Sequence, residues 1–287
     1  MKAKVEYIKF PKFKDYINQK VHWLQPKLDG YLAKIYKNRK GLPPIIFTKN
    51  DKDITTKVMA IKHIAKPLNT LPPHSQLFGE LHCPGIAATS ITTMLNNADQ
   101  RLNLTVFAAP MIHSRDLSGI NLHIVMAMLQ KYGFKVPKTI DLGNIILSEE
   151  YKKELLQKAI DEKFEGWALK QKHMSGWFKL KPVRTVDAFV IETYKSDSDR
   201  YKDGLKCIRI GVWKKDGSLL DLGTAGNGFK LEFRMQFMTQ EKRDTLLNRV
   251  CEIAYDSVAA KGKLRFPRFI RWRDDKNKID CTEDQLK

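Results

Sequence analysis

The sequence predicts an α+β protein of two domains, the second built almost entirely of strands. Its 287 residues suffice for two domains that each bury a core. The hydrophobic share of 43% is typical of a soluble globular chain. Strand-like and helix-like segments mix as far as Pro182, and short strand-like segments dominate after it. We therefore expect domains at residues 1–184 and 185–287.

The clearest helix of the first domain is expected over residues 148–164, SEEYKKELLQKAIDEKF. Ser148 can cap it, and Tyr151, Leu155 and Ala159 recur at four-residue intervals as one apolar stripe. The segment EGWALKQ follows at once and has the pattern of a buried strand. In GWFKLKP, apolar side chains alternate with lysines, which indicates a half-buried strand.

The second domain is predicted from a series of short strands. Asp216-Gly217 marks a hairpin turn, and TQEKRDTLLNRV is the one helix expected there. About a hundred residues with this pattern are typical of a small closed barrel such as the OB-fold. The expected strands lie in TVDAFVIETYK, LKCIRIGVWKKDGSLLDLGTA and RVCEIAYDSVA.

The charge of the chain indicates a polyanionic partner. Lys and Arg number 51 against 32 Asp and Glu, a formal net charge of +19. Nucleic acid is the leading candidate, because neutralised phosphates release counterions. An anionic membrane is the rival, but the sequence contains no basic amphipathic helix or lipidation signal.

The cysteines and the N-terminus indicate where the protein acts. The four cysteines lie far apart in sequence, without the paired spacing of a zinc site or a compact disulfide framework. The first twenty residues lack the apolar core of a signal peptide. We expect an intracellular protein acting in the cytoplasm.

The segment QPKLDGYLAK places Lys27 two residues before Asp29 and Gly30. One interpretation is a strand that ends in a turn and carries a solvated lysine. The other is that Lys27 is a nucleophile. The motif alone does not decide between them.

Three further segments carry charged residues in apolar surroundings. Glu80 lies in FGELHCPG, where it either binds a sugar hydroxyl or a metal, or pairs with a neighbouring lysine. Glu165 and Lys170 bracket the strand EGWALK. Lys179 and Lys181 are expected on one face of a strand, which suits a bound anion or a solvated edge.

Taken in order, KLDG, GEL, EGWALK and KLK resemble the motifs of a nucleotidyltransferase superfamily that comprises ATP-dependent DNA ligases, RNA ligases and mRNA capping enzymes. The segment LRFPRFIRWRDDK resembles the last motif of the ligases, with Arg273, Asp274 or Asp275, and Lys276 as its core. The resemblance covers nearly the whole chain and is closest to minimal phage-type ligases, which implies as an alternative a phage-encoded protein that acts in the host cytoplasm. It implies an N-terminal adenylation (nucleotidyltransferase) domain of antiparallel sheets and helices, followed by a C-terminal all-β OB-fold barrel.

The resemblance also implies a reaction. Lys27 would attack the α-phosphate of ATP to form a lysyl-adenylate, which requires a neutral amine. Asp29 would orient Lys27 and later act near the attacking 3′-hydroxyl. Glu80 would hold the ribose, and Glu80 and Glu165 would bind the divalent metal, Mg²⁺ or Mn²⁺ in its place.

Other residues would contact the rest of the nucleotide. Lys179 and Lys181 would stabilise charge on the α-phosphate. Phe107 in LTVFAAP would stack on the adenine, although an aromatic side chain in an apolar segment is more often core. Gln25 would contact the base from a loop. Arg273 and Lys276 would bind the β- and γ-phosphates, brought to them by a swinging C-terminal domain.

The implied function is an ATP-dependent DNA ligase, a monomer that seals 5′-phosphate/3′-hydroxyl nicks in duplex DNA. The chain departs from the ligase pattern at Leu32 and Lys49, where arginines are usual. Lys49 could still contact the 5′-phosphate, and Lys34 could compensate for Leu32. An RNA ligase, a capping-type enzyme and an inactive DNA-binding relative stay open as alternatives. The C-terminal arginines expected at DNA are Arg265, Arg268 and Arg271.

Overall fold

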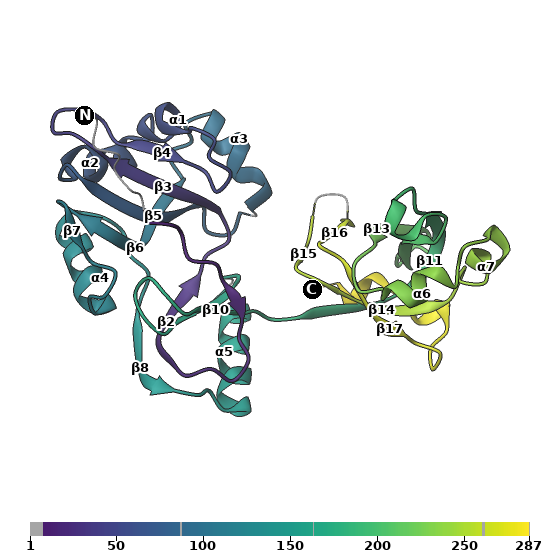
Figure 1. Cartoon of the computed structure of the whole chain (residues 1–287). Helices are drawn as coiled ribbons and strands as arrows, with labels where there is room; N and C mark the ends of the chain where they lie inside the picture. Colours follow the sequence, from purple (N-terminus) through teal and green to yellow (C-terminus); the bar gives the residue numbers. More distant parts are fainter. Residues whose placement is uncertain (1–7, 87, 163, 260–261, 287) are drawn as a thin grey trace. The chain divides into compact units, whose positions relative to one another are not determined.

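The computed structural model describes residues 8–86, 88–162, 164–259 and 262–286 (Figure 1). The chain divides into two compact units, Met1–Pro182 and Val183–Lys287. Both combine helices with largely antiparallel sheets, so the expected mixture of helix and sheet is confirmed. Within the described ranges, no helix is long and apolar enough to cross a bilayer.

The first unit contains two five-stranded sheets. One of them carries the KLDG lysine, because Lys27 ends a strand that pairs antiparallel with the EGWALK strand. Lys27 lies opposite Gly166, and the Glu165 amide donates to the Lys27 carbonyl oxygen over 3.0 Å. In spatial order this sheet consists of β1 (Lys14–Asp15), β10 (Trp177–Leu180), β9 (Gly166–Lys170), β2 (Val21–Lys27) and β8 (Ile140–Ile145).

The other sheet of this unit carries the GEL motif. Its central strands pair so that Leu32 lies opposite Glu80. In spatial order it consists of β4 (Ile45–Phe47), β3 (Tyr31–Lys37), β5 (Ser75–His82), β6 (Asn103–Ile112) and β7 (Arg115–Asp116).

Helices cover these sheets and complete the core. The main apolar cluster joins the sheet of β3, β5 and β6 to the helices packed beside it, while a smaller cluster lies under the long helix that precedes β9 (Figure 1). The helices of the first unit are α1 (Thr55–Met59), α2 (Lys62–Thr70), α3 (Ile91–Asn96), α4 (Leu122–Lys131), α5 (Glu149–Asp161) and the 3₁₀ segment Ala88–Ser90.

The helix expected over residues 148–164 is confirmed as α5. The Ser148 hydroxyl accepts from the Tyr151 amide over 3.1 Å, which caps one of the free donors at the helix start. Leu155 and Ala159 are buried against β9. The EGWALK strand is confirmed as well, because every residue of β9 is buried.

The second unit is built on one five-stranded sheet. The turn predicted at Asp216-Gly217 is confirmed, since Gly217 has a φ of +78° and Ser218 donates to Asp216 Oδ1 over 2.8 Å. In spatial order the sheet consists of β13 (Leu219–Ala225), β12 (Leu205–Trp213), β11 (Arg184–Lys195), β14 (Val250–Tyr255) and β17 (Arg268–Trp272).

The expected closed barrel is not observed. In the described part of this unit the ladder runs from β13 to β17 and stays open. One isolated bridge joins Asn227, just beyond β13, to Arg268, and Phe269 donates to the Asn227 carbonyl oxygen over 2.9 Å. The two edges of the sheet therefore meet at this point. Gly228 permits the approach, because a Cβ on this residue would lie 2.1 Å from the carbonyl oxygen of Phe269.

The second unit also has one helix more than expected. The predicted helix is present as α7, with the Thr239 hydroxyl as cap, and α6 precedes it. The further elements are α6 (Leu231–Met235), α7 (Gln240–Asp244), the hairpin of β15 (Ser257–Val258) and β16 (Leu264–Arg265), and the 3₁₀ segments Asp199–Tyr201, Lys278–Asp280 and Glu283–Gln285.

Candidate active site

Lys27 lies at the C-terminal end of β2 and is paired with Glu165, which immediately precedes β9. Glu165 Oε2 accepts from Lys27, and its other oxygen, Oε1, pairs with Lys181 just beyond β10. One carboxylate therefore joins two of the lysines that the sequence singled out. About a quarter or less of each of these three side chains is exposed, with 23%, 21% and 23% for Lys27, Glu165 and Lys181.

The charge state of Glu165 follows from these two contacts. Burial alone raises the pKa of a carboxyl group, but the charges of Lys27 and Lys181 outweigh it, and the pKa of Glu165 lies below its usual value. Glu165 is thus ionised at neutral pH. It can orient the Lys27 amine, but its low pKa makes it a weak general base.

Glu80 has the opposite character. Burial is the largest influence and raises its pKa to about 8, with Lys27 opposing the shift and Glu165 and Asp29 adding to it. Glu80 therefore carries a proton at neutral pH, and a protonated carboxyl group can donate one hydrogen bond and accept others. These properties suit a hydroxyl-rich ligand such as a ribose.

The turn after Lys27 depends on a glycine. A Cβ on Gly30 would lie 2.2 Å from the carbonyl oxygen of Leu81, so only glycine fits where β3 approaches β5. This approach brings Asp29 and Glu80 to the same place, and the Ala88 amide donates to Asp29 Oδ2 over 3.4 Å.

The two lysines of the KLK motif have different carboxylate partners. Lys179 in β10 pairs with Asp15 of β1 at 3.3 Å, whereas Lys181 pairs with Glu165. The same N-terminal segment places the Phe13 ring 6.0 Å from Lys27 Nζ. The groups expected at the α-phosphate are thus neutralised by side chains of the protein itself.

Phe107 lies in β6 at the margin of a small aromatic cluster. Its ring centroid is 6.0 Å from that of Trp177 and 6.2 Å from that of Phe10, and it is only partly buried. Leu32, which stands where ligases usually carry arginine, packs in the same cluster. The departure at Leu32 therefore replaces a charge with an apolar contact near Phe107.

Gln25 was expected in a loop, and that expectation is wrong. Gln25 lies in β2 with only 1% of its surface exposed. Its Nε2 donates to Thr139 Oγ1 over 2.8 Å, and its Oε1 accepts from Lys170 Nζ over 2.7 Å. The sequence misled because Pro26 follows Gln25, and proline is uncommon inside a paired strand.

Lys170 is a buried lysine to which the sequence motifs assign no role. It is fully buried and donates to the Phe107 carbonyl oxygen over 3.0 Å, with Nζ 4.1 Å from the centre of the Trp177 ring. Burial lowers its pKa well below the usual value. Its position at the end of an otherwise apolar strand was the signal, because a lysine there is rarely buried without a specific use.

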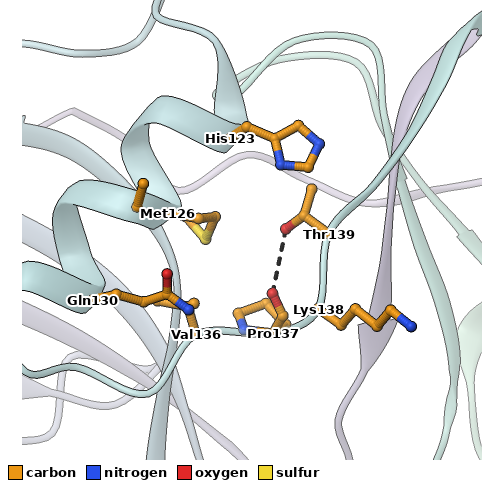
Figure 2. Close-up of a pocket in the computed structure, with 8 residues that line it drawn as sticks. His123, Met126, Gln130, Val136, Pro137, Lys138 and Thr139 are labelled. Atoms are coloured by element: carbon orange, nitrogen blue, oxygen red, sulfur yellow. Dashed lines mark hydrogen bonds between the residues drawn. The ribbon is translucent and has the colours of Figure 1, made fainter.

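A hollow of about 450 Å³ is lined in part by Thr139, the hydrogen-bond partner of Gln25, and Lys27 is not among its lining residues. Figure 2 shows His123 and Gln130 from α4 on one side and Thr139 on the other. Thr139 donates to the Pro137 carbonyl oxygen over 3.3 Å and accepts from Gln25, so one wall of the hollow is tied to β2.

The fit of a divalent metal can be judged from the carboxylates. Among the described residues, no three His, Cys, Asp or Glu side chains come together as a ready metal site. Glu165 is occupied by two lysines, and Glu80 carries its proton at neutral pH. A Mg²⁺ ion here would have to draw most of its ligands from phosphate oxygens and water, as Mg²⁺ commonly does.

Lys49 and Lys34 lie beside the sheet of β3. Lys49 is exposed in the turn after β4. Lys34 is paired with Asp51 and also donates to the Lys49 carbonyl oxygen over 3.4 Å. Lys34 therefore braces the turn that presents Lys49.

The RDDK segment of the second unit is internally paired. Arg273 donates to both oxygens of Asp187, at 3.0 and 3.2 Å, and through its other edge to Asp275. Lys276 also donates to Asp187, over 2.5 Å. Asp274 instead pairs with Arg249, so Asp275 is the acidic partner of Arg273 within the motif.

The other C-terminal arginines differ in their surroundings. Arg271 pairs with Glu252 at 2.8 Å, while Arg268 is exposed on β17. The Arg265 guanidinium lies 5.6 Å from the centre of the exposed Phe266 ring. Arg268 and Arg271 thus make β17 a basic strand whose charge Glu252 partly neutralises.

No family model matches the sequence. Proteins described as "Probable DNA ligase" are similar to it along most of its length. The one from Mycobacterium marinum is 24% identical over 297 residues, covering 90% of this chain and 56% of that protein. The one from Nocardioides sp. is 25% identical and covers 87% of this chain and 54% of its own length. The chain thus spans little more than half the length of these relatives.

Solved structures share the fold. The structure described as "DNA binding with a minimal scaffold: Structure-function analysis of Lig E DNA ligases" matches with a TM-score of 0.66 and 17% identity, over 93% of this chain and all of that one. The structure called "Pmar-Lig_PreS3" matches with a TM-score of 0.69 and 20% identity, over 92% of this chain and 67% of that one. At these identities the likeness is one of fold.

Proposed function

We propose that this chain, which is similar in sequence to DNA ligases and shares the fold of a minimal one, is an ATP-dependent DNA ligase. It would seal 5′-phosphate/3′-hydroxyl nicks in duplex DNA through a lysyl-AMP on Lys27. The observation that carries the proposal is the cluster of Lys27, Glu165 and Lys181, since three separate motifs supply it. The first unit would be the adenylation domain, and the second would be an OB-fold type of domain whose sheet stays open.

In the first step, the neutral amine of Lys27 attacks the α-phosphorus of ATP. A P–N bond forms, the bond to the bridging oxygen breaks, and pyrophosphate leaves. Glu165 orients the amine through its hydrogen bond. One proton leaves the Lys27 ammonium before the attack and a second leaves the nitrogen once the P–N bond has formed, and both pass to solvent because Glu165 stays ionised. Lys179 and Lys181 stabilise the charge that develops on the phosphate.

Adenylation also changes the charge balance around Glu165. Once Lys27 is bonded to phosphorus it is no longer a cation, and Glu165 keeps only Lys181 as a partner. Glu165 can then hold a divalent cation together with phosphate oxygens. Such a cation would neutralise charge on the phosphates.

The remaining residues would bind the rest of the substrates. The protonated Glu80 would bond a ribose hydroxyl, and Phe107 would stack on the adenine beside Gln25. Asp29 would act near the 3′-hydroxyl in the last step. DNA phosphates would be bound by the basic residues Lys49, Arg265, Arg268 and Arg271.

The test is covalent labelling by α-phosphate-labelled ATP with magnesium and without DNA. The wild type should become labelled and Lys27→Ala should not, while Lys62→Ala, an exposed lysine of α2, should match the wild type. Release of the label as AMP on addition of nicked duplex DNA, with sealing, would establish ligation. Labelling by GTP instead would favour a capping-type enzyme, sealing of nicked RNA alone would favour an RNA ligase, and no label would leave a DNA-binding protein.

A further inference from the structure

Asp187 is a buried carboxylate near the start of β11 that none of the predicted motifs includes. Only 9% of its side chain is exposed. Its backbone is tied to the C-terminal segment, because the Asp187 amide donates to Gln285 Oε1 over 3.1 Å. The position of the carboxylate is therefore determined by both the sheet and the chain end.

Two cations of the RDDK segment converge on this carboxylate. Arg273 Nη1 lies 3.0 and 3.2 Å from its two oxygens, and Lys276 Nζ lies 2.5 Å from Oδ2. Charge-assisted hydrogen bonds of this kind are short and directional. Asp187 thus determines the separation and the orientation of Arg273 and Lys276.

Asp275 contacts Arg273 in a different way. It occupies the edge formed by Nε and Nη2, at 2.8 Å each, and 64% of its side chain is exposed. An exposed carboxylate can be exchanged for a phosphate without uncovering a buried charge. A buried one cannot, because removing its partners would leave it uncompensated. Asp187 is therefore the fixed member of the cluster, and the Asp275 edge is the one a phosphate can reach.

We propose that Asp187 is a positioning residue that holds Arg273 and Lys276 as a preassembled receptor for the β- and γ-phosphates of ATP and for the departing pyrophosphate. The proposal rests on the ligase function proposed above. Asp187 lies outside the motifs, and the reaction should need it only in the step in which pyrophosphate takes part. Sealing of a nick that already carries AMP does not involve pyrophosphate and should not need Asp187.

The second unit offers a matched control in Asp221. This carboxylate is also shared by an arginine and a lysine, with Arg209 at 2.6 Å and Lys263 at 2.5 Å. Its side chain is 22% exposed, and it lies on β13, on the opposite edge of the sheet from β17. Removal of its charge should disturb the unit in a similar way without touching the RDDK segment.

The experiment compares Asp187→Asn, Asp187→Glu and Asp221→Asn with the wild type in two reactions. The first is lysyl-AMP formation from ATP, together with its reversal by pyrophosphate. The second is sealing of nicked DNA that has been adenylated chemically, without ATP. Asp187→Asn should raise the KM for ATP and for pyrophosphate by about tenfold or more, since misplacement of a phosphate-binding group is costly. It should seal adenylated DNA at the wild-type rate.

The other variants make the outcome decisive. Asp187→Glu keeps the charge but displaces it, and should fall between Asp187→Asn and the wild type in the first reaction alone. Asp221→Asn should match the wild type in both. Equal losses of Asp187→Asn in both reactions, or no loss in either, would overturn the inference. If Asp187→Asn does not fold, Asp187→Glu decides in the same way. A wild type that forms no lysyl-AMP would overturn the proposed function instead.

Discussion

Lys170 donates a 2.7 Å hydrogen bond to Gln25 Oε1, and both side chains are buried. The same amino group also donates to the Phe107 carbonyl oxygen. Lys170 therefore joins the two residues proposed at the adenine, which come from different sheets. Burial of a lysine is costly for the fold, and here the cost is offset by hydrogen bonds to both of these residues.

Lys170→Met is expected to weaken ATP binding while preserving the fold. Methionine fills a similar volume but leaves Gln25 without its donor, so the KM for ATP in lysyl-AMP formation should rise about tenfold, the cost of one misplaced polar contact. Burial lowers the pKa of Lys170 in the folded chain. At pH values between this lowered pKa and the ordinary pKa of lysine, Lys170 is therefore protonated in the unfolded chain but not in the folded one. The free energy of unfolding of the wild type should therefore rise with pH, up to about pH 10, relative to Lys170→Met. Urea titrations of both proteins across this range would show it, and parallel pH curves would contradict it.

Glu80→Gln should shift stability in the opposite direction with pH. The folded-state pKa of about 8 exceeds the ordinary value of 4.5, so the folded chain binds more protons between these values. Wild-type stability should fall as pH rises through this window, by at most about 1.4 kcal/mol per pH unit. Glu80→Gln cannot ionise and should lack this dependence. Chemical denaturation at three pH values between 5 and 8 measures the difference, and an equal slope in both proteins would show that Glu80 is ionised in the folded state.

Phe107→Leu separates base stacking from core packing. Leucine retains much of the apolar contact with Trp177, so the free energy of unfolding should fall by less than about 1.5 kcal/mol. Loss of an aromatic face under a base costs about 1–3 kcal/mol of binding. The KM for ATP should therefore rise about tenfold. A stability loss without a change in KM would identify Phe107 as a core residue only.

Gly30→Ala should disrupt the turn after Lys27. The added Cβ would meet the Leu81 carbonyl oxygen at 2.2 Å, and overpacking against backbone costs about 3 kcal/mol. Gly119→Ala is the control, because a Cβ at that position would have nothing within 4 Å and its φ is not in the left-handed region. Thermal unfolding should separate the two variants clearly. Equal melting temperatures would mean that β3 and β5 can move apart.

Local sequence signals predicted the elements that depend on neighbouring residues. The Ser148 cap and the apolar stripe of α5 act within a few turns of helix, and the Asp216-Gly217 turn acts within four residues. The short helix α6 escaped notice, because its five residues carry neither a side-chain cap nor a full apolar stripe. Local sequence patterns also could not predict that the barrel stays open, because closure depends on how Asn227 and Arg268 meet across the sheet.

The motifs located the candidate site, but they did not predict which of its side chains pair with one another. Glu165 was assigned to a metal and Lys181 to a phosphate, yet the two contact each other, and Glu165 also contacts Lys27. Spacing indicates which residues belong to a site, whereas the choice of partner depends on distances across β2, β9 and β10. Asp187 could not be found in this way, because its partners lie almost ninety residues later in the chain.

The internal ion pairs of the second unit change how strongly the proposed interaction with DNA should respond to salt. Arg209, Arg271 and Arg273 are each held by carboxylates of the protein. A guanidinium that is already neutralised displaces fewer condensed ions from a duplex than a solvated one. The number of ions exchanged on binding should therefore fall well short of what the formal charge of +19 suggests.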